Sequence, residues 1–327
     1  MNEEYLWNRS GEPDPEVARL ENLLAPLAYR ASAPVPLQRR TSVWKARFLS
    51  AAAAVAVVAG LSAWFARRPG PVHSGTPAWQ IAASQGTPRV SGKPLAASTG
   101  IYAGQVIETG AHSSATLQSE SVGRLVLEPQ SRLRVEAATP ERQVLSLQQG
   151  TIHALIWAPP ARFVVDTPSA RATDLGCAYT LHVDSDGGGL VTVQTGWVAF
   201  GWKGIESFVP AGAACSTSPK HGPGIPYFLD ATPEFRTALA GLRHGGSLDI
   251  VLEQARKRDA LTLWHLLKRV PPDQRGRVFD RFALLVPLPP DVRRDGILAG
   301  NPGMLDRAWD ALDLGDTTWW RHWRQDW

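Results

Sequence analysis

The feature that most constrains this chain is an uncharged, apolar run from Phe48 to Ala66. An α-helix rises about 1.5 Å per residue and the hydrocarbon layer of a bilayer is roughly 30 Å thick, so about 20 apolar residues are needed to cross it. The run just reaches this length. Polar, Pro-rich segments lie on both sides of it, which is not typical of a buried core helix. Residues 48–66 are therefore predicted to form one transmembrane helix.

The charges beside this run predict its orientation. Four basic residues lie between Arg39 and Arg47, whereas only Arg67 and Arg68 follow closely. The flank with more Lys and Arg usually stays in the cytoplasm, so the N-terminus is predicted to be cytoplasmic and the remainder exported. A cleaved signal peptide is the alternative. Such peptides usually occupy roughly the first 15 to 30 residues, however, and this run begins only at Phe48.

The cytoplasmic segment, 1–47, contains one predicted amphipathic helix followed by a Pro-rich linker. Asp14 is placed as the N-cap and Pro15 at the first helical position. An isolated helix of this length is marginal in water, and its acidic residues disfavour an anionic bilayer surface. Its apolar face is therefore predicted to bind a cytoplasmic protein, with the bilayer surface as the alternative. The face consists of Val17, Leu20, Leu23, Leu24 and Leu27.

After a second linker, 67–78, the apolar period changes to two. Short alternating runs separated by turn residues extend over 79–226. In the clearest of them, Leu133 and Val135 alternate with charged residues and are predicted to face inward. Several strands at such spacing predict an all-β sandwich or barrel.

From Tyr227 the pattern becomes helical. Apolar stripes that begin at Leu248, Leu261, Val278 and Met304 predict four short helices joined by Pro-rich connections. Residues 227–327 are therefore predicted to form a small all-α helical bundle. The closing tryptophans, which either pack on this bundle or form an exposed aromatic patch, are Trp319, Trp320, Trp323 and Trp327.

The cysteines and the polar residues do not indicate a catalytic or metal-binding function. Cys177 and Cys215 either form one disulfide on the exported side or remain two separate buried thiols. The sequence contains no catalytic motif and no metal-ligand spacing, so we expect no enzyme, cofactor or metal. The net charge of +4 is spread evenly along the chain, so no nucleic-acid contact is expected.

A succession of short motifs in the β region resembles the FecR domain. The motifs are Gly104–Thr109, Ser114–Leu117, Gly123–Leu127, Ser131–Val135, Leu147–Gly150, Phe163–Pro168, Asp174–Gly176 and Val193–Val198. The resemblance implies a single-pass protein of the bacterial inner membrane, with its C-terminal domains in the periplasm. It also implies that the periplasmic part receives an envelope signal and that the cytoplasmic segment controls an extracytoplasmic-function sigma factor. The alternative is a non-enzymatic envelope-binding protein for a polysaccharide, peptidoglycan or protein ligand.

Overall fold

The structure is a computed structural model that describes residues 14–25, 77–96 and 98–315. The chain divides into two units, Met1–Val72 and His73–Trp327. Within the described ranges no helix has the length and apolar character needed to span a bilayer. The predicted transmembrane helix, 48–66, lies outside the described residues, as do the four C-terminal tryptophans.

The described part of Met1–Val72 is a single helix, α2 (Pro15–Leu24). The side chain of Asp14 accepts a hydrogen bond from the backbone N–H of Glu16 at 2.9 Å, and Pro15 occupies the first turn. The predicted helix start is thereby confirmed. Asp14 satisfies one of the backbone donors that a helix leaves free at its N-terminus.

The β region of His73–Trp327 consists of two sheets that share one long strand, β9 (Gln143–Ile156). The first sheet runs in the order β4 (Gly100–Ile101), β1 (Trp79–Gln85), β6 (Ser114–Ser119), β7 (Gly123–Leu127), β9, β12 (Ala178–Val183), β13 (Gly189–Thr195) and β16 (Ala213–Ser218). Two short strands, β17 (Gly222–Pro223) and β18 (Tyr227–Phe228), both pair with β16.

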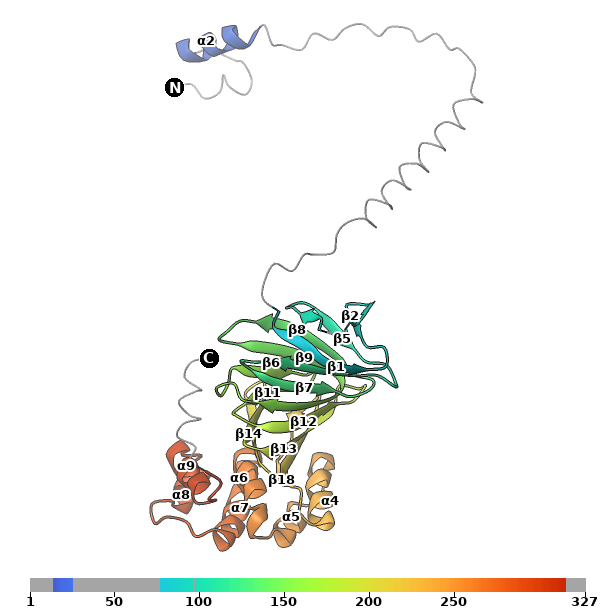
Figure 1. Cartoon of the computed structure of the whole chain (residues 1–327). Helices are drawn as coiled ribbons and strands as arrows, with labels where there is room; N and C mark the ends of the chain where they lie inside the picture. Colours follow the sequence, from blue (N-terminus) through green and yellow to red (C-terminus); the bar gives the residue numbers. More distant parts are fainter. Residues whose placement is uncertain (1–13, 26–76, 97, 316–327) are drawn as a thin grey trace, which may run out of the picture. The chain divides into compact units, whose positions relative to one another are not determined.

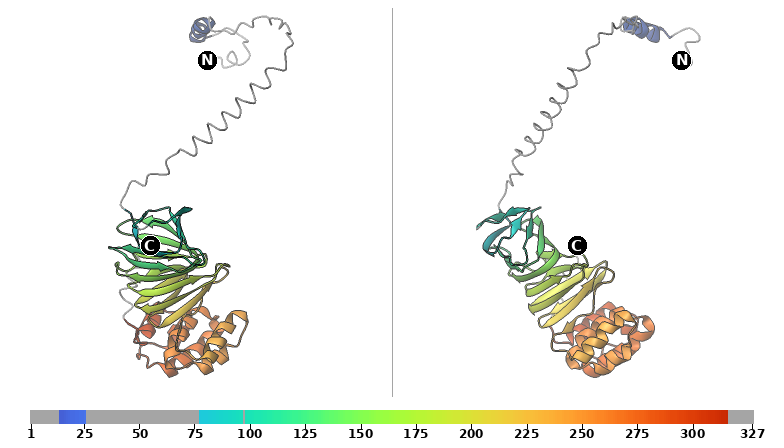
Figure 2. Two further views of the ribbon diagram at one scale, coloured as in Figure 1. Left: turned by 45° about the vertical axis from the view of Figure 1, so that its right-hand side comes forward. Right: turned by 90° about the vertical axis from the view of Figure 1, so that its right-hand side faces the viewer.

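The second sheet runs in the order β3 (Lys93–Pro94), β2 (Arg89–Val90), β5 (Val106–Glu108), β8 (Arg132–Ala138), β9, β10 (Phe163–Asp166), β11 (Arg171–Asp174), β14 (Trp197–Trp202) and β15 (Ile205–Pro210). Strands β9 and β10 are parallel, and the other pairs described here are antiparallel. The described strands thus form a large mixed β-sheet domain, in which they lie one above the other (Figures 1 and 2).

Strand β9 passes from one sheet to the other at Gly150. Up to Gln149 it pairs with β8 in the second sheet, and from Gly150 it pairs with β12 in the first. Gly150 has φ +96°, and a Cβ at this position would lie 2.3 Å from Oγ of Ser131. Only glycine tolerates both the conformation and the close approach. Strand β9 continues through this position because the glycine bends the chain without ending the strand.

Alternating side chains supply the core of the β domain. Leu133 and Val135 are fully buried, whereas Arg132, Arg134 and Glu136 are exposed, which confirms the inward face predicted for this strand. A strand with one buried and one solvated face requires this period of two.

A small helical region follows the β domain. Its elements are α4 (Pro233–Gly241), η2 (Leu242–His244), α5 (Leu248–Gln254), η3 (Lys257–Asp259), α6 (Ala260–Arg269), α7 (Pro272–Leu285), α8 (Arg294–Leu298) and α9 (Pro302–Asp310). The four predicted stripes lie on α5, α6, α7 and α9. The pattern missed α4 and α8, because these helices bury only two residues and one residue, respectively. The predicted start at Tyr227 falls in β18, and helices begin only at Pro233.

Helix α6 joins the helical region to the β domain, and its residues from Ala260 to Leu267 are all buried. Thr262 donates from Oγ1 to the carbonyl oxygen of Pro226 at 2.8 Å, and Nε2 of His265 accepts from the backbone N–H of Phe208 at 3.0 Å. The helices gather at the end of the β domain where β13, β14 and β18 lie (Figure 1). Because buried polar contacts and apolar packing both cross this junction, the two parts form one body.

Aromatic side chains from both parts meet at the same junction. Trp197 stacks on Phe208 with ring centroids 4.9 Å apart, and Trp309 of α9 contacts both rings. Trp264 of α6 lies 4.7 Å from Trp309 in an edge-on arrangement. Aromatic pairs of this kind add about 0.5–1.5 kcal/mol each beyond the area they bury.

Candidate functional site

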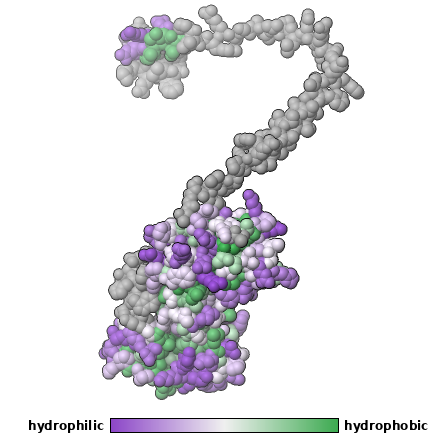
Figure 3. Space-filling model, in the orientation of Figure 1, coloured by the Kyte–Doolittle hydropathy of each residue, from purple (hydrophilic) through white to green (hydrophobic). Residues whose placement is uncertain are grey.

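The predicted partner-binding face of α2 is exposed. Leu20, Leu23 and Leu24 are 58%, 66% and 59% exposed, Val17 is half-buried, and no residue of this helix is buried. Leu27 lies outside the described residues. Figure 3 shows apolar surface on α2 beside hydrophilic surface. The structure therefore places three of the five predicted residues together on one exposed apolar face of α2.

The two cysteines are separate, buried thiols, so the disulfide considered from the sequence is not formed. The thiol of Cys177 donates to the carboxyl group of Asp174, and that of Cys215 contacts the carbonyl oxygen of Gly224 at 3.5 Å. Burial raises the pKa of Asp174 to about 7, and burial together with Asp174 raises the pKa of the Cys177 thiol far above its ordinary value. A thiol kept protonated in this way is a poor nucleophile.

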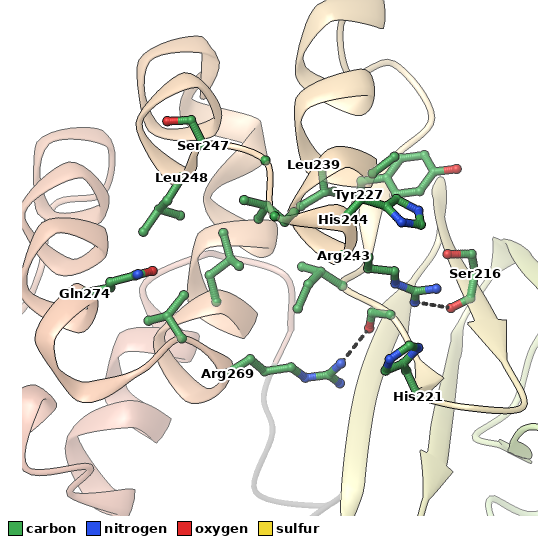
Figure 4. Close-up of a pocket in the computed structure, with 18 of the residues that line it drawn as sticks. Ser216, His221, Tyr227, Leu239, Arg243, His244, Ser247, Leu248, Arg269 and Gln274 are labelled. Carbon is green, nitrogen blue, oxygen red and sulfur yellow. Dashed lines mark hydrogen bonds between the residues drawn. The ribbon is translucent and has the colours of Figure 1, made fainter.

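A candidate binding site in the described residues is a pocket of about 1230 Å³ in His73–Trp327 (Figure 4). We call it the junction pocket, because β14 to β18 line one side of it and α4, η2, α5, α6 and α7 line the other. Its apolar lining includes Trp202, Ile205, Ile225, Tyr227, Leu239 and Leu242. Concave sites with an apolar lining and a few polar groups are the ordinary form of a ligand-binding site.

The charged residues of the junction pocket are mainly cationic. One carboxylate, Asp249, lines it, and Arg277 forms an ion pair with this carboxylate. The cations that line it are Lys220, Arg236, Arg243, Arg269 and Arg277, and His221 and His244 lie among them. An excess of cations around a concave surface attracts anionic ligands.

Arg269 is the most constrained of these cations. Nη1 donates to the carbonyl oxygens of Pro223 and Gly224 at 2.7 and 3.0 Å, and Nη2 donates to the carbonyl oxygen of Glu206 at 2.9 Å and to Oγ of Ser207 at 2.6 Å. Burial lowers the pKa of the guanidinium, although arginine stays charged in proteins. Arg269 therefore fastens the end of α6 to β15 and β17.

No pattern in the sequence predicted this pocket. Its cations come from separate elements between Lys220 and Arg277, so no basic run appears in the chain, and the even charge count predicted no basic face. The described residues also contain no group of three or more His, Cys, Asp or Glu side chains that could hold a metal ion. The junction pocket offers positive charge and apolar surface, which suit the binding of a ligand more than catalysis.

The fold and the pocket define a mixed β-sheet domain that carries a small helical region, with a cationic binding site where the two meet. Residues 105–199 match the family model described as FecR protein, so the chain carries a FecR family domain. The predicted resemblance is confirmed. The matched residues extend from the start of β5 into β14, and the lining of the junction pocket lies outside them.

Solved structures and curated proteins were also compared with the chain. Two crystal structures of a "putative anti-sigma factor" from Parabacteroides distasonis, at 1.65 and 2.50 Å resolution, resemble the chain at 16% identity with a TM-score of 0.34. Each match covers 41% of this chain and 63% or 62% of the other, so it spans less than two thirds of those chains. No curated protein matches the sequence.

Proposed function

We propose that this protein is a membrane-anchored, signal-transducing regulator that controls an extracytoplasmic-function sigma factor. The observation that carries the proposal is the exposed leucine face of α2, and the FecR family domain in the same chain supports it. In this proposal α2 binds the sigma factor, and the FecR domain with its helical region receives the envelope signal. No enzymatic step is involved.

The energy available from α2 is sufficient for regulated binding. Fully burying a leucine contributes about 1.5–3 kcal/mol, and α2 presents three described leucines. Association costs at least about 4 kcal/mol, so these three leucines alone leave at most about 5 kcal/mol, which corresponds to sub-millimolar binding. A membrane anchor raises the effective concentration of a tethered binding site, so moderate affinity suffices.

Replacing Leu20 or Leu24 with aspartate in the full chain is expected to weaken binding of the sigma factor encoded nearest this gene by at least about tenfold. Each substitution removes about 1.5 kcal/mol or more of apolar burial and places a carboxylate in the contact. The matched control is Asn22→Asp, which adds the same charge on the opposite side of α2. Binding is measured by calorimetry. Equal affinities for all these chains would refute the regulator and favour an envelope-binding protein.

The membrane location is part of this proposal and has its own test. Alkaline phosphatase fused after Trp327 is expected to be active, because the larger basic cluster before residue 48 keeps the N-terminus in the cytoplasm. A cytoplasmic reporter fused before Met1 is expected to be active in the same cells. Release of a shortened, soluble chain from membranes would instead identify the apolar run as a cleaved signal.

A further inference from the structure

Two of the five cations in the junction pocket are already occupied by the protein itself. Arg269 donates to four acceptors on β15, β17 and the turn that follows, and Arg277 is paired with Asp249. These two guanidinium groups hold the walls of the pocket in place. Asp249 is the acidic residue that lines the pocket, and its carboxylate is already paired with Arg277. Among the described residues, no other lining carboxylate is therefore present to neutralise the remaining cations.

The other three cations are available to a ligand. The side chains of Lys220 and Arg236 belong to exposed residues and form no hydrogen bond or ion pair with any part of the chain that the structure describes. Arg243 makes one long hydrogen bond, 3.5 Å from Nη2 to the carbonyl oxygen of Ser216. Arginine side chains bind planar carboxylates through two parallel hydrogen bonds, which makes carboxylate a well-matched partner for such a group.

The pocket between these cations is apolar. Leu239 is buried, and Ile225 and Leu242 are half-buried at its surface, where Figure 4 shows Leu239 pointing between the helices and Tyr227. A ligand with negative charge alone would leave this surface uncovered. The lining therefore fits a ligand that carries both carboxylates and apolar groups.

The size and the aromatic residues of the pocket narrow the class of ligand. Its volume of about 1230 Å³ is above the roughly 300–1,000 Å³ of ordinary small-molecule sites. Sugars pack their C–H groups on open aromatic faces, but the ring of Trp202 is already covered. Nζ of Lys203 lies 4.2 Å from the ring centroid, and Gly222 packs so closely that a Cβ there would lie 2.6 Å from the ring.

We propose that the junction pocket binds an acidic, partly apolar peptide segment of a partner protein. Its carboxylates pair with Lys220, Arg236 and Arg243, and its apolar side chains cover Leu239 and Leu242. Because α4 to α7 supply one wall and β14 to β18 the other, a peptide that binds here contacts both the β domain and the helical region. The inference does not depend on α2 or on the sigma factor, so either proposal can fail alone.

The test uses the purified full chain and a fluorescent, N-acetylated heptapeptide in which glutamate and leucine alternate. We expect saturable binding that weakens at high salt, because part of the attraction is between exposed charges. The double variant Lys220→Glu, Arg236→Glu is expected to bind at least about tenfold more weakly, since each charged hydrogen bond contributes about 1.5–3 kcal/mol. The same peptide with lysine in place of glutamate is expected not to bind.

The matched control is the double variant Arg124→Glu, Lys257→Glu, which changes the net charge equally at exposed positions outside the pocket. It is expected to bind the peptide within about twofold of the unmodified chain, as exposed charges at a distance are screened. Equal weakening in both double variants, or no binding by the unmodified chain, would overturn the proposal. Displacement of the peptide by an equal concentration of citrate would also overturn it, because the site would then accept small anions.

Discussion

Replacing Arg269 with methionine is expected to lower the free energy of unfolding by about 3 kcal/mol. Methionine retains the apolar stem but leaves Oγ of Ser207 and three carbonyl oxygens without the guanidinium, although the carbonyl oxygen of Gly224 keeps its hydrogen bond from Oγ of Ser207. An unsatisfied buried acceptor costs about 1–3 kcal/mol, and water that enters from the junction pocket recovers part of that cost. The acceptors that lose the guanidinium are Glu206, Ser207, Pro223 and Gly224.

Urea unfolding of the full chain, followed by tryptophan fluorescence, measures this loss. The matched control is Arg236→Met, which removes the same group from an exposed position on α4 and is expected to change stability by less than about 0.5 kcal/mol. Because Arg269 fastens α6 to the β domain, amides of the helical region should also exchange faster with solvent in Arg269→Met. If the two variants had equal stability, Arg269 would not hold the junction.

The second large effect is the loss of stability below pH 6.5 that we expect from His265. Burial is the main cause that lowers the pKa of this imidazole to about 3, with Arg269 and Lys268 nearby. Nδ1 donates to the carbonyl oxygen of Leu261 at 2.9 Å, and Nε2 accepts from the backbone N–H of Phe208 at 3.0 Å. Since Phe208 N–H can only donate, a proton on Nε2 would break this contact between α6 and β15.

The direction of the pH effect follows from the lowered pKa. Between about pH 3 and 6.5 the unfolded chain binds a proton at His265 that the folded chain does not, so stability rises with pH. The contribution is fully present above pH 6.5 and is lost as the pH falls toward 3, where the loss is on the order of 4 kcal/mol. At pH 5 about 2 kcal/mol should already be lost.

A variant isolates this contribution from that of Asp174. The pKa of Asp174 is raised to about 7, so Asp174 stabilises the folded chain at low pH, and this stabilisation is lost as the pH rises through 7. His265→Gln keeps an acceptor for Phe208 N–H but cannot be protonated. As the pH falls from 7 to 4, the unmodified chain loses the His265 contribution and the variant does not. The stability advantage of the unmodified chain over His265→Gln should therefore narrow. His244→Gln, at an exposed position, should preserve the original pH dependence. An unchanged pH profile in His265→Gln would contradict the assignment.

Local patterns in the sequence determined the elements that bury one face. The alternation at Leu133 and Val135 predicted a strand, and the stripes on α5 and α7 predicted helices, because the buried residues of such a segment repeat with period 2 or 3.6. The start of α2 at Asp14 was predictable for a similar reason, since a cap acts within one helical turn. The order of the FecR motifs likewise predicted the domain that residues 105–199 match.

Tertiary structure decided what depends on residues far apart in the chain. Gly150 bends β9 from one sheet into the other with φ +96°. Ser131 lies so close that only glycine fits, and the sequence near Gly150 does not reveal that neighbour. Cys177 pairs with Asp174 and not with Cys215, because folding sets which buried groups meet. The junction pocket has the same origin. Lys220, Arg236 and Arg243 form a cationic site only when β16 to β18 pack beside α4 and η2, and an even charge count along the chain contains no information about that packing.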